Sequence, residues 1–409
     1  MTVVVIGGGP AGMIAAAEAA GAGAHTILLE QNEKLGKKLY ITGKGRCNVT
    51  NACERDGFFA AVVRNPRFLY SAFAAFDNRD LMALIERQGV PLKTERGGRV
   101  FPVSDKSSDI LRAMERYVRL SGAEVRLHTR ATGISMENGA VRAVSTQAGE
   151  IPCDAAIVAT GGCSYPQTGS TGDGYRFAAQ AGHAVEPPCG ALVPLVTNET
   201  WPAALAGLTL KNVTLSAYRE QKRLFQSEPG EMLFTHFGVS GPLVLTLSSR
   251  IAEQPAGVRL AIDLKPGLTE EQLDARLLRD LDANRQKLLA GALHALLPER
   301  LLLAVLELSG VNAQKRVSEL TRAERMAVRN TLKALPLTVR CARPIEEAVV
   351  TRGGVSVREV RSRDLASKRV HGLYFAGEVL DVDAVTGGYN LQIAWSTGAL
   401  AGRSSVCSD

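Results

Sequence analysis

The sequence lacks any long hydrophobic run. None of its apolar stretches approaches the roughly 18 to 20 residues that a helix needs to cross a bilayer. The first apolar run, Val3 to Ile6, is cut short by Gly7 and has no basic segment before it, so it does not resemble a signal peptide. We therefore expect a cytoplasmic protein without a membrane partner.

Cysteines are few and are not arranged in pairs. The seven cysteines include no C-x-x-C motif, and their number is odd. This usage suits a reducing compartment and argues against a disulfide scaffold and against a structural zinc site. We therefore expect no metal.

Aromatic residues are scarce, at 5% of the chain, and they do not alternate with the basic residues. A surface that stacks nucleic-acid bases would need that alternation. The formal net charge of +7 permits an anionic partner, but a mildly basic, solvated surface is the simpler interpretation. We expect a small-molecule substrate and consider nucleic acid the less favoured partner.

What the sequence does contain is a glycine-rich turn near its start. The turn reads G-G-G-P-A-G from Gly7 to Gly12, and an apolar run precedes it. An alanine-rich segment and a second apolar run follow, ending in Glu30. This order predicts strand, turn, helix and strand, in which the spaced glycines allow the turn, the approach of a pyrophosphate and close packing of helix on strand. The helix N–H groups would face the phosphates, and Glu30 would accept a hydrogen bond from a ribose hydroxyl. The motif predicts a dinucleotide site without deciding between NAD and FAD.

The segment from Lys34 to Asn51 is dense in glycine and in cations. We interpret it as a loop that wraps the cofactor, in which the N–H groups of Gly43 and Gly45 flank a pyrophosphate. The charges of Lys37 and Arg46 would add to this anion site. A flexible basic loop is the alternative interpretation.

Apolar patterns predict the remaining elements. In the first half of the chain we expect helices over 68–76, 80–88 and 107–121, a hairpin over 93–102, strands over 124–127, 133–136 and 140–146, a buried strand over 155–162 that ends in a glycine turn, and a helix to residue 181 capped by Ser170, Thr171 or Asp173. In an inserted part we expect strands over 192–196, 213–219, 232–234 and 258–262, and helices over 270–296, 299–308 and 322–334.

Two further glycine turns follow predicted strands. Thr160-Gly161 ends a buried strand, at the edge where ligands bind to a parallel sheet. Near the C-terminus a strand ends in Gly377-Glu378, and Gly388 precedes a helix that ends near residue 403. The N–H groups at the start of that helix would suit a flavin C2 carbonyl, where negative charge develops.

Taken together, residues 7–12 with Glu30, residues 42–51 and residues 377–392 resemble the aminoacetone-oxidase and bile-acid-reductase (BaiN/RdsA-type) family of NAD(P)/FAD-dependent oxidoreductases. The resemblance extends through A-T-G-G at 159–162, L-F-T-H-F-G-V-S-G-P at 233–242 and V-T-R-G-G-V at 350–355. It implies an α/β fold with a Rossmann-like FAD-binding domain built from both chain ends, and with an inserted β-barrel-like subdomain and a helical subdomain. The expected domains are 1–190 with 351–409 for FAD, 191–267 with 335–350 for the β subdomain, and 268–334 for the helical subdomain.

The resemblance also assigns roles to single residues. Gly7, Gly9 and Gly12 would line the FAD pyrophosphate, and Glu30 would bind the adenosine ribose. Arg46 and Asn48 would lie near the flavin, Glu378 would touch ribityl or phosphate oxygens, and Gly388 to Gln392 would meet the isoalloxazine ring. The complete set of residues expected to bind the cofactor is Gly7, Gly9, Pro10, Ala11, Gly12, Glu30, Gln31, Lys37, Gly43, Gly45, Arg46, Cys47, Asn48, Arg130, Ala131, Thr160, Gly161, Gly377, Glu378, Gly388, Tyr389, Asn390, Leu391 and Gln392.

The expected chemistry depends on which molecule donates electrons to the cofactor and which molecule accepts them. No second G-x-G-x-x-G follows a strand, so FAD is the expected cofactor and NAD(P)H would visit only transiently as electron donor. The reductases of the family imply reduction of an activated C=C bond, which we expect here, and its oxidases imply oxidation of an amine by oxygen as the alternative. A transfer-RNA-modifying flavoprotein, which the basic segment 358–369 would fit, and a flavin-binding sensor without turnover stay open.

His236 and Tyr389 are the candidate catalytic residues. His236, in a glycine-rich loop, would donate a proton to the substrate, or else bond to backbone in a turn. Tyr389 is a candidate by its position alone. Cys47 and Cys53 invite comparison with the redox pair of flavin disulfide reductases, but their spacing is C-x5-C instead of the usual C-x4-C. We expect Cys47 to be a small residue packed near FAD.

Overall fold

The computed structural model describes residues 1–407, which divide into two compact units. The first unit is Met1–Ala191 with Ile345–Asp409, and the second is Leu192–Pro344. Each is described by itself, and the three-part division expected from the sequence stays a prediction. Within residues 1–407, no helix is long and apolar enough to cross a membrane.

A five-stranded parallel sheet forms the centre of the first unit. Its strands lie in the order β21 (Leu373–Phe375), β11 (Ala155–Val158), β1 (Thr2–Ile6), β2 (His25–Leu29) and β7 (Glu124–Arg126). All residues of β11 and β21 are buried, as are all but the first of β1, which is typical of parallel strands covered on both faces. Because the strands are parallel, the turns that follow β1, β11 and β21 lie at the same edge of the sheet.

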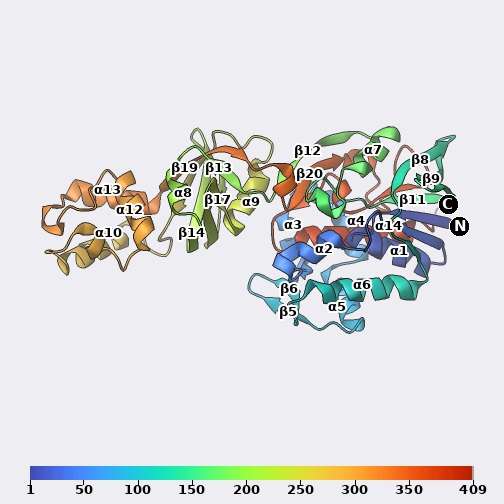
Figure 1. Cartoon of the computed structure of the whole chain (residues 1–409), viewed down its shortest axis with the longest axis horizontal. Helices are drawn as coiled ribbons and strands as arrows, with labels where there is room; N and C mark the ends of the chain where they lie inside the picture. The colour runs from blue at the N-terminus through green and yellow to red at the C-terminus, as the bar shows by residue number, and fades with distance from the viewer. Residues whose placement is uncertain (408–409) are drawn as a thin grey trace. The chain divides into compact units, whose positions relative to one another are not determined.

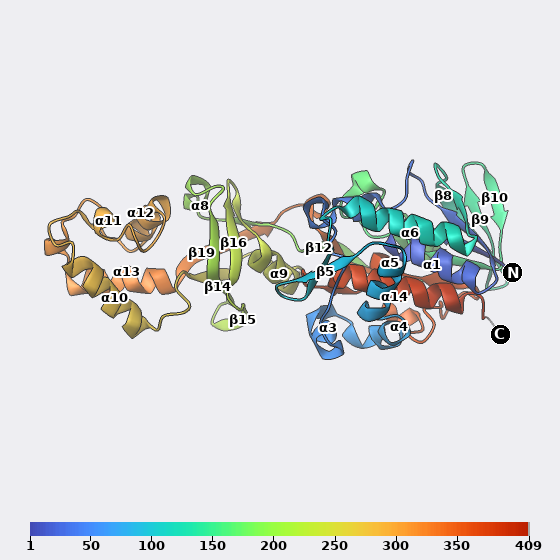
Figure 2. The same cartoon turned by 90° about the horizontal axis from the view of Figure 1, so that it is seen from below.

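Two helices from opposite ends of the chain, α1 (Pro10–Gly21) and α14 (Tyr389–Ser404), lie side by side in both views (Figures 1 and 2). Small residues allow this close contact, because a Cβ on Gly398 would lie 2.3 Å from the Ala11 carbonyl oxygen. A Cβ on Gly402 would lie 2.4 Å from the Ala15 carbonyl oxygen. These two contacts advance in the same direction along both helices, so α1 and α14 are parallel and their N-termini point the same way.

The remaining elements of the first unit surround this centre. Their bounds are α2 (Lys37–Ile41), β3 (Thr50–Asn51), α3 (Arg55–Ala61), β4 (Val62–Arg64), α4 (Tyr70–Ala75), α5 (Asn78–Arg87), β5 (Leu92–Glu95), β6 (Arg99–Pro102), α6 (Ser107–Ser121), β8 (Ala131–Glu137), β9 (Ala140–Thr146), β10 (Gly149–Pro152), α7 (Asp173–Gln180), β12 (Val185–Ala191), β20 (Val350–Val355) and β22 (Asp383–Ala384). The helices α4, α5 and α6 and the hairpin of β5 and β6 confirm the predicted cap elements.

Six strands of the second unit close into a barrel. They follow the order β14, β16, β17, β13, β19 and β18, and β18 pairs back onto β14. The barrel strands are β13 (Leu195–Thr197), β14 (Thr209–Arg219), β16 (Gly230–Thr235), β17 (Gly238–Ser240), β18 (Arg259–Asp263) and β19 (Leu335–Ala342), with β15 (Lys222–Gln226) paired to β14. The unit also contains α8 (Trp201–Ala204), α9 (Pro242–Ile251), α10 (Glu270–Asp282), α11 (Leu289–Ala292), α12 (Glu299–Leu308) and α13 (Arg322–Lys333). The expected fold class, a Rossmann-like domain with a barrel and helices, is confirmed.

Three local predictions are wrong. The helix expected over 270–296 is broken after α10, where the Asn284 side chain donates to the Asp280 carbonyl at 2.8 Å and so satisfies a helix-end acceptor. The cap of α7 is Gly172, in the left-handed region at φ 80°, and not Ser170, Thr171 or Asp173. The expected loop of residues 34–51 contains the short helix α2.

His183 is a buried histidine in the first unit. Its Nε2 lies 2.7 Å from Ser367 Oγ, and its Nδ1 lies 3.6 Å from a Glu359 carboxylate oxygen. Its side chain is fully buried, and this burial, together with the nearby Arg369 charge, lowers the pKa of His183 although Glu359 opposes the shift.

This burial predicts a pH dependence of stability. The unfolded chain takes up a proton near pH 6.5, whereas folded His183 resists it, so stability is complete above about pH 6.5 and is lost as pH falls through the lower folded pKa. Urea titrations from pH 8 to 5 should show the loss in the wild type and a flatter profile in His183→Gln. Glu359, whose pKa Arg369 lowers to about 2, would act only below about pH 4.5. A profile that is equally steep in both proteins would contradict the assignment.

Candidate functional site

The glycine turn before α1 leaves open space in front of a helix N-terminus. Gly9 is the N-cap of α1, and no side chain caps the helix. A Cβ on Gly9 would meet nothing within 4 Å, whereas a Cβ on Gly7 would lie 2.6 Å from the Ala159 carbonyl oxygen. A Cβ on Gly12 would lie 1.8 Å from the Gly7 carbonyl oxygen. Two glycines therefore permit close packing, and the third keeps free the place where unpaired N–H groups attract an anion.

Glu30 lies directly after β2 and is 7% exposed. Its Oε2 accepts from the Gly8 N–H at 2.8 Å, and its Oε1 accepts from the Asn32 N–H and side chain at 2.8 and 2.6 Å. These bonds hold the carboxylate beside the glycine turn. Because each carboxylate oxygen has about two acceptor positions, Oε2 keeps capacity for a ribose hydroxyl.

Arg46 anchors the glycine-containing loop that follows α2. The Arg46 guanidinium lies 2.5 Å from a Glu95 carboxylate oxygen and 2.6 Å from Asp105, and it stacks 4.1 Å from the Phe101 ring centre. The hydrogen bonds to Glu95 and Asp105 raise the pKa of Arg46. Glu95 and Phe101 belong to β5 and β6, so the contacts fix the loop to that hairpin. Asn48 follows with a buried Oδ1 that has no hydrogen-bond partner among the described residues, and this acceptor is available to a ligand.

An ion pair joins helix α2 to the turn after β21. Lys38 Nζ lies 2.7 Å and 3.0 Å from the two Glu378 oxygens and 2.6 Å from Ser164 Oγ. Glu378 also accepts from the Thr351 N–H at 2.7 Å. Thr351 Oγ1 in turn accepts from the N–H groups of Cys163 and Ser164 at 2.8 and 3.1 Å. The carboxylate therefore has several protein donors, and its direct contact to the cofactor stays a prediction.

Lys37, the lysine predicted to flank the pyrophosphate, is bonded to two neighbouring side chains, and its role stays a prediction. Its Nζ lies 3.2 Å from Glu33 and 3.3 Å from Asn32 Oδ1. Neighbouring helix residues diverge by about 100° around the axis, so only one of two adjacent lysines can face Glu378. Lys38, Ser164 and Thr351, which bond to Glu378, were not singled out from the sequence. The sequence shows two adjacent lysines, Lys37 and Lys38, but it does not indicate which of them pairs with Glu378.

We expect Lys38→Met to weaken FAD binding about tenfold and to lower the free energy of unfolding of the apoprotein by about 1 to 3 kcal/mol. The reason is that Glu378, which is partly buried, would lose its balancing charge. Fluorescence titration of apoprotein with FAD and urea unfolding measure the two effects. Lys37→Met is the matched control, because its exposed pair with Glu33 contributes little. Equal losses in both variants would show that Lys38 has no special role.

Two glycines, Gly387 and Gly388, directly precede α14. Gly388 is its N-cap at φ 98°, and a Cβ there would lie 2.3 Å from the Thr50 carbonyl oxygen. No side chain caps this helix. The Asn390 side chain holds the preceding turn through bonds to the Ala384 N–H at 2.9 Å and carbonyl at 2.8 Å. Fully buried Gln392 accepts from Thr50 Oγ1 at 2.6 Å. Asn390 and Gln392 therefore shape the helix start.

Tyr389 is the first residue of α14 and is half-buried. Burial, together with the neighbouring Cys53 thiol, raises the pKa of Tyr389 to about 12. The same burial raises the pKa of Cys53. At neutral pH both groups hold their protons, so Tyr389 is a hydrogen-bond and proton donor.

The remaining predicted cofactor residues are distributed around the turns. Gln31 Nε2 donates to the Gly169 carbonyl at 2.7 Å, and Arg130 makes a forked pair with Asp173 at 2.9 to 3.1 Å. Ala131 opens β8. Thr160 and Gly161 follow β11, with Gly161 at φ 74°. Gly377 donates its N–H to Thr397 Oγ1 at 2.9 Å.

The cysteine pair considered from the sequence is unsuited to dithiol chemistry. Cys47 and Cys53 are both free thiols. Cys47 is fully buried, and this burial raises its pKa to about 12 although Thr42 opposes the shift. A thiol that resists ionisation is a poor nucleophile, so Cys47 behaves as a small packing residue.

His236 belongs to the second unit. It is exposed in the two-residue turn between β16 and β17, and its ring lies edge-on to Phe237 at 4.9 Å. Phe237 also carries the Arg343 guanidinium 4.8 Å above its ring. The role of His236 as a proton donor stays a prediction.

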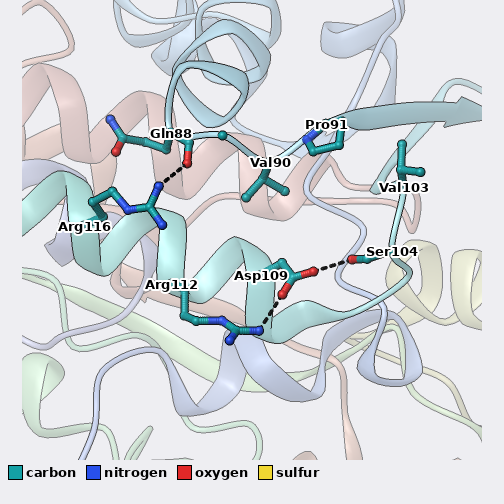
Figure 3. Close-up of a pocket in the computed structure, with 9 residues that line it drawn as sticks. Gln88, Val90, Pro91, Val103, Ser104, Asp109, Arg112 and Arg116 are labelled. Atoms are coloured by element: carbon teal, nitrogen blue, oxygen red, sulfur yellow. Dashed lines mark hydrogen bonds and ion pairs between the residues drawn. The ribbon is translucent and has the colours of Figure 1, made fainter.

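A cavity of about 510 Å³ lies between the end of α5, the start of β5 and helix α6 (Figure 3). Its polar groups bond to one another. Arg116 donates to the Gln88 carbonyl, while Arg112 and Ser104 both donate to Asp109. The cavity shares no residue with the glycine turns of α1 and α14.

The positions of the two helix N-termini fit FAD. Gly9 caps α1 two residues before Ala11, and Gly388 caps α14 ten residues before Gly398, which packs on Ala11. The N-terminus of α14 therefore extends roughly 12 Å beyond that of α1, at 1.5 Å per residue. This offset is comparable to the length of the ribityl chain that joins the flavin to the pyrophosphate. The two uncapped N-termini therefore suit a pyrophosphate at α1 and a flavin at α14.

A model of the family described as "HI0933-like protein Rossmann domain" matches residues 1–404. The chain belongs to the HI0933-like family. The family resemblance expected from the sequence is therefore confirmed, and the chain is an FAD-dependent oxidoreductase. 

Two named relatives of this HI0933-like protein cover nearly the whole chain. A 3-dehydro-bile acid delta(4,6)-reductase from Clostridium scindens is 32% identical over 98% of this chain and 98% of its own length. A ribosomal RNA dihydrouridine synthase from Haemophilus influenzae is 31% identical over 96% of each chain. Among solved structures, 3-ketosteroid delta1-dehydrogenase from Sterolibacterium denitrificans has a TM-score of 0.55 at 12% identity and covers 100% of each chain, which shows a shared fold.

Proposed function

We propose that the protein reduces an activated C=C bond of a small organic substrate, with NAD(P)H as the electron source of its FAD. The observation that carries the proposal is the end-to-end similarity to the 3-dehydro-bile acid delta(4,6)-reductase. The relatives named ribosomal RNA dihydrouridine synthases form dihydrouridine, which is also the addition of two hydrogens across a C=C bond conjugated to a carbonyl. Relatives with different named substrates therefore carry out the same type of reaction. This agreement supports the proposed reaction type more strongly than it supports either substrate.

When bound, FAD supplies the electron pair of such a reduction. The chain must then orient the substrate and provide a proton. Tyr389 suits the second task, because its pKa of about 12 keeps the phenol protonated and it stands first in α14. Its hydroxyl would give its proton to the carbon that gains hydrogen.

The electron donor is tested by anaerobic bleaching of the purified flavoprotein. We expect NADPH or NADH to bleach the flavin absorbance, and candidate amines such as aminoacetone to leave it unchanged. Bleaching by an amine alone would replace the reductase with the oxidase, and no bleaching by any donor would favour a sensor. His236→Ala should bleach at the same rate, because a proton donor to substrate acts only after the flavin is reduced.

RNA is the second candidate substrate. Two relatives, 31% and 30% identical, are named ribosomal RNA dihydrouridine synthases, and this chain carries a formal net charge of +7. The expectation of a small-molecule substrate stays a prediction. An anaerobic experiment distinguishes the two candidate substrates. The reduced protein is mixed with either a cyclic enone or a ribosomal RNA transcript, and reoxidation of the flavin is measured. Reoxidation by the transcript alone, with salt-dependent binding, would make RNA the substrate.

A further inference from the structure

The Asn51 side chain joins the turn before α14 to two other segments of the first unit. Its Nδ2 donates to the Gly387 carbonyl at 3.0 Å and to the Gly97 carbonyl at 2.9 Å, while its Oδ1 accepts from the Cys53 N–H at 3.1 Å. Asn51 is 3% exposed, and both donors of its amide are used. If the amide were turned over, its oxygen would face two carbonyl oxygens. The bonds therefore allow only one orientation of this amide.

The segment that carries Asn51 is fixed to α14 along its length. Trp395 Nε1 donates to the Val49 carbonyl at 3.2 Å, and Thr50 Oγ1 donates to Gln392 Oε1 at 2.6 Å. All four of these residues are fully buried. Buried, satisfied hydrogen bonds of this kind hold one geometry. The fold itself therefore fixes where Asn51 lies relative to the first turn of α14.

The same amide reaches the turn between β5 and β6. Gly97 and Gly98 form that turn, and both are in the left-handed region, at φ 78° and 73°. A Cβ on Gly98 would lie 2.4 Å from Asn51 Oδ1, so glycine is what allows the amide to approach. The Ala52 N–H adds a bond to the Gly98 carbonyl at 2.7 Å. One side chain thus links the hairpin, to which Arg46 is also bonded, with the start of α14.

The bond to the Gly387 carbonyl sets the direction of the next N–H group. The peptide between Gly387 and Gly388 is trans, and the carbonyl and N–H of a trans peptide point in opposite directions. The Gly388 N–H therefore points away from Asn51. Within residues 1–407 this N–H has no acceptor, and neither do those of the first three residues of α14. A hydrogen bond accepted by the carbonyl also polarises the peptide, which makes its N–H a stronger donor.

We propose that Asn51 is a positioning residue that aims the Gly388 N–H at the bound flavin and thereby raises the reduction potential of the flavin. The proposal rests on a flavin at the N-terminus of α14, which the proposed function also uses. Negative charge develops at the C2 carbonyl and N1 of the flavin on reduction, so a fixed N–H donor stabilises the reduced form more than the oxidised form.

Asn78→Ala is the matched control for Asn51→Ala. Asn78 is 4% exposed, and its amide donates to the carbonyls of Asn51 and Cys53 at 2.6 and 2.9 Å. Neither of these bonds reaches the turn before α14. The control therefore removes two buried hydrogen bonds of the same kind and keeps the bond to the Gly387 carbonyl.

The hydrogen bond is tested first in the apoprotein by nuclear magnetic resonance. Glycine labelled with ¹⁵N and with ¹³C at its carbonyl selects the Gly–Gly peptides, one of which joins Gly387 to Gly388. The ¹⁵N shift of Gly388 responds to a hydrogen bond at the Gly387 carbonyl. We expect this signal to move in Asn51→Ala and to keep its position in Asn78→Ala. An unmoved signal in Asn51→Ala would overturn the proposal with no flavin present.

The reduction potential of the bound flavin tests the consequence. Asn51→Ala should weaken the binding of reduced relative to oxidised flavin about tenfold, which lowers the two-electron potential by about 30 mV. Asn78→Ala should keep the wild-type potential, even where urea unfolds both variants equally early. An unchanged potential in Asn51→Ala would overturn the proposal, and an equal fall in both variants would mark a merely structural effect.

A second variant covers a loss of cofactor. If Asn51→Ala binds no FAD, Asn51→Ser repeats the potential measurement with a side chain that is one atom shorter and has a single donor. Neither the shift nor the potential requires a substrate. Failure of the wild type to reduce any enone would therefore refute the proposed function and leave the role of Asn51 standing.

Discussion

Gly12→Ala protein is expected to bind no FAD and to be less stable by about 3 kcal/mol. The added Cβ would lie 1.8 Å from the Gly7 carbonyl oxygen, so either the turn or the helix must move. Both movements disturb the N-terminus of α1, where the pyrophosphate is expected. Flavin content after purification and urea unfolding of the apoprotein measure the two effects.

Gly9→Ala separates binding from folding. Its Cβ would meet no protein atom within 4 Å, and Gly9 has an ordinary φ of −78°, so the apoprotein should keep wild-type stability. The methyl group would nevertheless enter the space before α1, and FAD affinity should fall at least tenfold. Gly21→Ala is the matched control for binding. Gly21 lies at the far end of the same helix, and a Cβ there would also meet no protein atom within 4 Å. Full FAD content in Gly9→Ala would show that the phosphates lie elsewhere.

Tyr389→Phe is expected to slow substrate reduction about 100-fold while leaving flavin bleaching by NAD(P)H unchanged. The variant keeps the ring that packs near Phe58 and removes only the proton that the substrate needs. Stopped-flow absorbance measures each half-reaction separately. Because the pKa of Tyr389 is about 12, its ionisation should cause no fall in wild-type rate between pH 6 and 9.

Tyr70→Phe is the control for Tyr389→Phe. Tyr70 belongs to the same aromatic cluster, edge-on to Phe59 at 4.5 Å, but its side chain is 44% exposed. It should keep the wild-type rate. If Tyr389→Phe also keeps that rate, the proton comes from another group, and His236 becomes the first alternative.

Local patterns predicted the core of the FAD unit correctly. The apolar runs became β1 and β2, and the alanine-rich segment became α1. At the spaced glycines an added Cβ would lie as close as 1.8 Å to a backbone oxygen, so only glycine fits there. These features depend on neighbours within a few residues, and such neighbours are visible in a sequence.

Contacts between distant segments could not be predicted. The ion pairs of Arg46 with Glu95 of β5 and with Asp105, which follows β6, were not expected, and the predicted role of Arg46 at the cofactor stays a prediction. Lys38 pairs with Glu378 near the opposite end of the sequence. Such partners are set by tertiary packing, which overrides what composition alone indicates. Closure of the barrel between β14 and β18 likewise needed the structure.

The central claim is that FAD held between the N-termini of α1 and α14 delivers electrons to a C=C bond. Its most direct test mixes the photoreduced protein, under argon and in D₂O, with a cyclic enone and follows flavin absorbance and product mass. The account predicts reoxidation of the flavin with one equivalent of saturated ketone that carries solvent deuterium. A flavin that stays reduced with the enone but is promptly reoxidised by oxygen would contradict it.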